Sequence, residues 1–180
     1  MAICKLNKNL TRTNSCGYSL PEIVNIWLVN FDEITDTDFS SSGGCEEITS
    51  MTLASSATVS HVEPLKNSAS FEDTLVVADN GTRYRNASIS FSVAGTYDSC
   101  MHGALDALSL GRYFAMVQTA DGNYLGFGRM SPLEAETATL AGGSDNNGLQ
   151  VVLSGNIAES PMPMSDAAVN KVKEKVVVED

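Results

Sequence analysis

The clearest pattern in the chain is the alternation of apolar and polar residues between Arg85 and Thr96. Successive side chains of a strand point to opposite faces, so this alternation predicts a strand with one buried and one polar face. The apolar set is Ala87, Ile89, Phe91 and Val93, and the polar set is Ser88, Ser90 and Ser92. A row of serines on a sheet is most often a solvated face, and the alternative is a face that meets water inside a channel.

Further strands and two hairpins are predicted around this one. Asn80-Gly81 tolerates the positive φ of a type I′ turn, so residues 71–78 and 83–96 are expected to pair antiparallel. Asp121-Gly122 predicts a second hairpin between 112–119 and 123–130. A last alternating strand contains Leu149, Val151, Leu153 and Ile157, whereas residues 131–143 are expected to be irregular.

A short helix is predicted between these strands, over residues 98–110. Asp98 or Ser99 caps its start and Gly111 suits its end. Its apolar stripe is Met101, Ala104, Leu105 and Leu108.

The N-terminal half is less regular. Residues 22–31 are β-branched and aromatic, which favours a largely buried strand. Residues 32–47 are rich in Asp, Ser and Gly, and we expect them to form a long exposed loop. Residues 48–62 fit one long strand, roughly 50 Å if unbroken.

The C-terminal segment has a different character from the strands before it. Ser165-Asp166 is a helix-capping pair, and an apolar stripe with helical spacing follows it, interrupted by a highly charged stretch over residues 171–175. We therefore divide the chain into a β-rich domain over residues 1–164 and a charged tail with helical spacing over 165–180. We expect that tail either to dock on a partner or to be mobile.

Composition narrows the function classes. The chain has 180 residues and 43% apolar content, enough for one ordinary core, and it has no apolar run long enough to cross a membrane. No secretion signal is recognisable, and the four cysteines form no CxxC pair, so we expect reduced thiols and synthesis in a cytoplasm. The net charge of −11 disfavours nucleic-acid binding, although solubility alone explains it equally well.

Candidate chemistry is sparse. His61 and His102 have no metal-ligand spacing, and His102 with its neighbouring aspartates reads as a solvated helix surface. The sequence contains no phosphate loop, dinucleotide fingerprint or nucleophile elbow. We therefore expect no enzyme and no cofactor, and favour a structural or interaction protein that works through loops and strand edges.

Three stretches of the second half carry a resemblance to a known family: Gly111–Val117, Asp121–Gly128 and Asp145–Gly155. They resemble the C-terminal half of tail-tube and tail-hub proteins of tailed bacteriophages. The N-terminal half is suggestive of phages or prophages of Bacteroides-type bacteria, including the crAss-like group.

The resemblance implies a mainly β fold, an antiparallel β-sandwich or half-barrel with one flanking helix and a long inter-subunit loop. It implies a structural virion protein that forms a hexameric ring, with an acidic channel through which DNA passes during ejection without specific binding. Its partners would be itself and neighbouring tail or portal-side virion proteins. The reaching loop would hold Asp36, Asp38, Phe39, Ser42, Gly43 and Gly44, and the channel face would hold either Ser88, Ser90 and Ser92 or residues of 48–62.

Two other functions stay open on the sequence. One is a secreted or cell-surface β-sandwich that binds carbohydrate or mediates adhesion, which the low aromatic content of 7% disfavours. The other is a phage head-completion or decoration protein.

Overall fold

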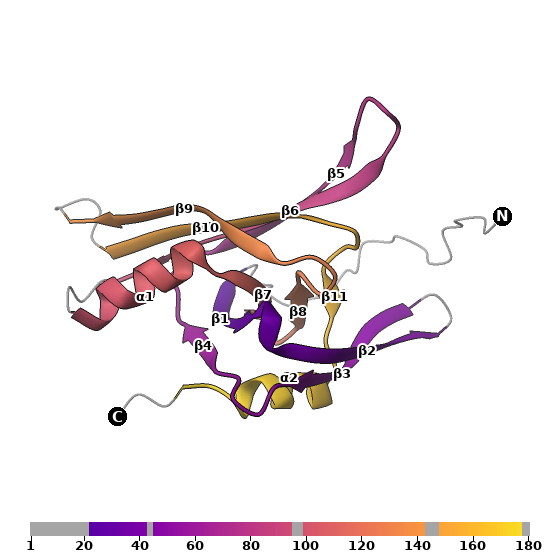
Figure 1. The fold of residues 1–180 in the computed structure, drawn as a ribbon, viewed down its shortest axis with the longest axis horizontal. Helices are drawn as coiled ribbons and strands as arrows, with labels where there is room; N and C mark the ends of the chain where they lie inside the picture. The colour runs from indigo at the N-terminus through magenta and orange to yellow at the C-terminus, as the bar shows by residue number, and fades with distance from the viewer. Residues whose placement is uncertain (1–21, 43–44, 95–98, 143–147, 178–180) are drawn as a thin grey trace, which may run out of the picture.

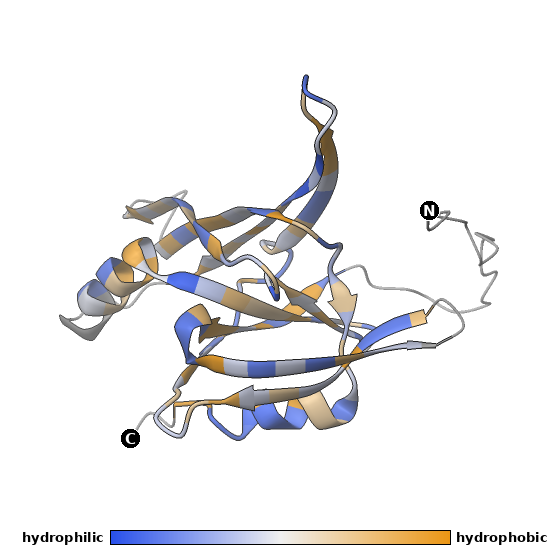
Figure 2. Ribbon diagram, turned by 45° about the vertical axis from the view of Figure 1, so that its right-hand side comes forward, coloured by the Kyte–Doolittle hydropathy of each residue, from blue (hydrophilic) through white to orange (hydrophobic). Residues whose placement is uncertain are grey.

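The computed structural model describes residues 22–42, 45–94, 99–142 and 148–177. As the sequence predicts, the fold is mainly β with antiparallel pairing, a sandwich of two layers. A third, thinner layer covers one side of the sandwich (Figure 1). Along the strands, hydrophobic and hydrophilic residues alternate (Figure 2), as expected for strands with one buried face.

The first layer is built on β1, which lies between β4 and β7. On its far side β7 pairs with β8, and β8 with β11. The bounds are β1 Ile23–Asn30, β4 Val59–Val62, β7 Arg112–Thr119, β8 Tyr124–Phe127 and β11 Met162–Pro163.

The second layer has four strands in the order β9-β10-β6-β5. A short contact joins the two layers, where Tyr113 pairs with Leu133 and Arg112 with Glu134. The bounds are β5 Ser70–Val77, β6 Arg83–Val93, β9 Leu133–Ala141 and β10 Gly148–Ile157.

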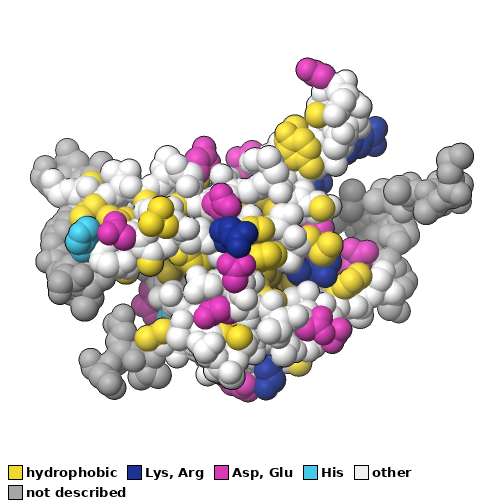
Figure 3. All heavy atoms as spheres, viewed as in Figure 1, with side chains coloured by type: hydrophobic (Ala, Val, Ile, Leu, Met, Phe, Trp, Pro, Cys, Tyr) yellow, Lys and Arg dark blue, Asp and Glu magenta, His cyan; other side chains and the backbone are white. Residues whose placement is uncertain are grey.

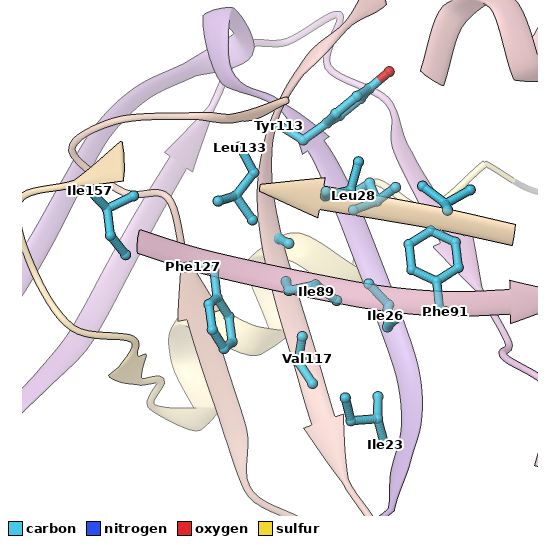
Figure 4. Close-up of a cluster of buried hydrophobic side chains, with 14 of the residues drawn as sticks. Ile23, Ile26, Leu28, Ile89, Phe91, Tyr113, Val117, Phe127, Leu133 and Ile157 are labelled. Carbon is cyan, nitrogen blue, oxygen red and sulfur yellow. The ribbon is translucent and has the colours of Figure 1, made fainter. Parts of the chain in front are cut away.

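The main core fills the space between the two layers. It takes the inward side chains of β1, β7, β6 and β10, and Figure 4 shows them converging from both sheets. In β6 these are Ala87, Ile89 and Phe91, all at most 2% exposed. The alternation in the sequence therefore identifies the buried face of this strand correctly.

A second core lies on the other face of the first layer, where Trp27, Val29, Phe114 and Met116 point outward. The β2–β3 ribbon and α2 cover them, and the buried side chains of α2 are Ala168, Val169 and Val172. The bounds are β2 Ile34–Ser42, β3 Cys45–Leu53 and α2 Asp166–Lys173.

The expected long loop over residues 32–47 is wrong. A 3-10 turn over Phe31–Glu33 leads into β2, which pairs antiparallel with β3 to make a two-stranded ribbon. The segment buries little apolar surface, as its composition indicates, but cross-strand pairing satisfies its backbone groups without a core.

The single long strand expected over residues 48–62 is also wrong, because the chain breaks after Leu53. Ala54 and Ala57 make turn hydrogen bonds there, and β4 then joins a different sheet from β3. Within β3 an irregularity in register changes the parity, so that Ile48 and Met51 are the buried residues.

Residues 131–143, expected to be irregular, contain the strand β9. The two predicted hairpins are present, with Gly81 and Gly122 at φ of 82° and 84°. The helix α1 spans Ser99–Leu110 as predicted, apart from Asp98, which lies outside the described residues.

The segment over 165–180 does not behave as a separate tail within its described part. Ser165 caps α2 by accepting a hydrogen bond from the backbone N–H of Ala168 at 3.3 Å. The helix packs on its own chain, with Val169 3% and Val172 0% exposed. Residues 165–177 therefore belong to the same folded unit as the strands.

Candidate functional site

The polar face of the second layer is the largest surface that the sequence singled out. Ser88, Ser90 and Ser92 lie on the face of β6 opposite its buried residues, and each is partly exposed. Ser90 Oγ lies 2.8 Å from Ser70 Oγ, which bridges to the edge strand β5. The serines thus belong to one hydrogen-bonded sheet surface.

The strand register extends this face across all four strands, because residues opposite one another in an antiparallel pair share a face. Asn86 on β6 donates to Asn156 on β10 at 3.0 Å. The other members, all on neighbouring strands, are Ser70, Glu72, Thr74, Glu134, Thr137, Thr139, Gln150, Val152 and Ser154. This set contains two carboxylates and no Lys or Arg, and we call it the polar face.

Both edge strands of the second layer carry long unpaired edges. Within the described residues, β5 pairs only with β6, and β9 beyond Glu134 pairs only with β10. An unpaired edge presents a row of backbone N–H and C=O groups that can pair with another strand. The two edges lie on opposite sides of one sheet, and α1 contacts β9.

The far end of the β5–β6 hairpin projects from the body of the molecule (Figure 1). Its surface mixes hydrophobic, basic and acidic side chains (Figure 3), with Leu75 55% and Val77 57% exposed. Near its base Phe71 meets Phe127 edge-on, with ring centroids 5.3 Å apart.

An ion pair ties the two strands of this hairpin together. Arg85 Nε donates to both carboxylate oxygens of Asp73, at 2.8 and 2.7 Å. This hydrogen bonding raises the pKa of Arg85 above its ordinary value. The pair stiffens the hairpin without covering Leu75 and Val77.

The predicted loop residues lie in the β2–β3 ribbon. Asp36, Asp38 and Phe39 are exposed on β2, Ser42 is its last residue, and Gly43 and Gly44 lie outside the described residues. The Arg129 guanidinium lies 4.6 Å from the Phe39 ring centroid, and Arg129 also forms a two-point ion pair with Glu159. The ribbon is therefore attached to the body at Phe39.

The helix α1 closes one side of the sandwich. Leu105 and Leu108 pack against the main core, as the predicted stripe requires, whereas Ala104 remains exposed. Met101 belongs to the helix, but its side chain lies outside the described part. The Tyr113 hydroxyl donates to the Ala107 carbonyl at 2.7 Å, and burial raises the pKa of Tyr113.

A cleft of about 850 Å³ lies where β4, β6, α1 and residues 176–177 meet. Most of the lining is apolar, and its described residues include Tyr113, His61 and Glu63 but no Lys or Arg. No local pattern in the sequence indicates this cleft, because its wall combines residues from seven separate segments.

His61 takes part in a group of aromatic side chains between β1, β4 and β8. Its ring stacks on Trp27 at 5.1 Å, and its Nε2 lies 2.9 Å from Asn25 Oδ1. On α2, Lys173 lies 4.9 Å from the Trp27 ring centroid and donates to the Tyr124 hydroxyl at 2.8 Å. These contacts hold α2 to the first layer.

Among the described residues, no three His, Cys, Asp or Glu side chains gather as a metal site. None of the described helices is long and apolar enough to cross a membrane. Comparison with family models, with curated proteins and with solved structures found no match to this chain.

Proposed function

We propose that this protein is a structural subunit that joins copies of itself edge to edge into a closed ring, with the polar face lining a channel. The observation that carries the proposal is the second layer itself. One of its faces is polar across four strands and contains no Lys or Arg, and both of its edges are unpaired over most of their described length.

Edge pairing between β5 of one copy and β9 of the next is a heterologous contact, since two different surfaces meet. Such contacts close into rings when the rotation between neighbours allows it. Closure also removes the exposed strand edges that otherwise promote aggregation. The projecting β5–β6 hairpin, with Leu75 and Val77 exposed, supplies apolar surface for the same contact.

The polar face suits a channel for DNA. A wall with carboxylates and without Lys or Arg does not displace counterions from phosphates, so it does not retain the polymer at each contact. Together with the resemblance of residues 111–155 to phage tail proteins, this favours a hexameric ring of a tail tube or tail hub, assembled in the host cytoplasm and located in the virion tail.

The test is the size of the particles that the purified full chain forms, by mass photometry and negative-stain imaging. We expect rings of uniform size, and we expect Leu75→Lys to shift the population to single chains, because it places a charge in the apolar contact. A tenfold weaker association corresponds to about 1.4 kcal/mol per interface.

Met130→Lys is the matched control, since Met130 is similarly exposed at 58% and lies on neither edge strand. This variant should form rings as the native chain does. A native protein that stays monomeric at high concentration would overturn the proposal. The proposal would also fail if Leu75→Lys and Met130→Lys changed the particle size equally.

A further inference from the structure

The apolar cleft takes no part in the contacts of the proposed ring. Its hydrophobic wall is made by Leu28, Leu65, Phe91, Val93, Leu108 and Leu149. Leu65 is 43% exposed and Val177, at the rim, is 52% exposed, so apolar surface faces water there. A cleft of this size and composition is typical of a binding site.

The first 21 residues of the chain lie outside the described structure and differ in charge from the remainder. They contain Lys5, Lys8 and Arg12 and no acidic residue. The remaining residues hold eight basic against all twenty-two acidic side chains, a net charge of −14. The cleft lining matches that sign, because Glu63 is the one carboxylate among its described residues and no Lys or Arg accompanies it.

The same segment has an apolar stripe at helical spacing. Ile3, Leu6 and Leu10 follow the i, i+3, i+7 pattern, and at about 100° per residue they share one face of a helix. The three basic residues fall on the opposite face. A segment with this pattern binds an apolar groove through its stripe and leaves its charges at the rim.

We propose that residues 1–12 dock in the cleft, with Ile3, Leu6 and Leu10 against its apolar wall and the basic residues toward Glu63 and the acidic surface. The linking residues 13–22 reach about 35 Å when extended. Docking is a contact within the chain or between copies, and it does not depend on ring formation.

Hydrogen–deuterium exchange on the full chain tests this contact. In the native protein, amides of residues 2–12 should exchange more slowly than in the free peptide of the same sequence. Leu65→Asp should speed their exchange by roughly tenfold or more, since burying one leucine is worth at least about 1.5 kcal/mol. Met130→Asp, at an exposed apolar residue outside the cleft and on neither edge strand, should leave it unchanged.

The reciprocal variant Leu6→Asp keeps the test decisive should the cleft variant fail to fold. It should speed exchange in residues 60–65 and 104–108, which line the cleft, and leave α2 unchanged. Unprotected residues 2–12 in the native chain would overturn the proposal, and so would protection that neither Leu65→Asp nor Leu6→Asp reduces. Particle size, measured in parallel, reports on the ring separately, and dependence of the protection on concentration identifies docking between copies.

Discussion

Replacing Val172 by alanine tests whether α2 is part of the folded core or an appended tail. The Val172 side chain is fully buried in the second core, between α2 and the outer face of the first layer. The substitution removes two methyl groups, worth about 1.6 kcal/mol of transfer free energy at ~0.8 kcal/mol each. The cavity left behind adds to this, so we expect a loss of about 2 kcal/mol in the free energy of unfolding.

The measurement is urea unfolding followed by circular dichroism, with Val177→Ala as the control. Val177 is 52% exposed, and its truncation should change stability by less than about 0.5 kcal/mol. For a chain of this length, 2 kcal/mol also corresponds to a fall of about 4–8 °C in Tm. If Val172→Ala proves as harmless as Val177→Ala, α2 is not packed as described and the second core is not cooperative with the first.

Two further substitutions examine the buried tyrosine and the polar face. Burial raises the pKa of Tyr113, so the neutral form of its side chain is favoured in the folded state. This contribution to the free energy of unfolding is present below about pH 10 and is lost as pH rises through the pKa of the folded state. Tyr113→Phe should therefore lower the free energy of unfolding by about 1 kcal/mol at pH 7, because the hydrogen bond to Ala107 is lost. The stability of this variant should also fall less steeply above pH 10 than that of the native chain, as measured by urea unfolding midpoints at a series of pH values. A variant that declines as steeply as the native chain would contradict this assignment. Ser88→Lys should leave particle size unchanged, but the assembled rings should bind DNA in a mobility-shift assay, with binding that weakens as salt is raised. Rings of this variant that do not bind DNA would argue that the polar face lies outside the channel.

Periodicity was sufficient to predict the strands that have one face in the main core. In β6 the alternation of Ala87, Ile89 and Phe91 with serines fixes both the strand and its buried face, because the core accepts only one of the two sets. The Asn80-Gly81 turn then determines the partner strand. At these positions the turn residues and the pattern of buried side chains indicate the same structure, so a single sequence was enough to predict these strands.

The β2–β3 ribbon and β9 were not predicted because neither owes its structure to a continuous apolar face. In the ribbon, Gly43-Gly44 separates the paired residues Ser42 and Cys45 by two positions, which is a hairpin signal. The abundant Asp and Ser around it indicate a loop more strongly than the glycines indicate a turn. In β9, pairing with β10 stabilises a Thr- and Glu-rich segment whose sequence has weak strand preference.

The candidate surfaces were predictable to different degrees. Which side of β6 is polar follows from parity alone, but the extension of that face over β5, β9 and β10 depends on register, which a single sequence does not specify. The cleft depends on seven segments meeting in space. Its position could not be inferred from any local pattern.

The layering explains why assembly through edges suits this fold better than assembly through faces. The outer face of the first layer carries Trp27, Val29, Phe114 and Met116, and the chain covers it with its own ribbon and α2. The outer face of the second layer carries small polar side chains, which lose hydration without gaining apolar contact if another protein covers them. Water is therefore the favourable neighbour for the polar face. In the proposed ring, the edges of β5 and β9 would gain backbone hydrogen bonds from a second copy, and the polar face would stay open to solvent.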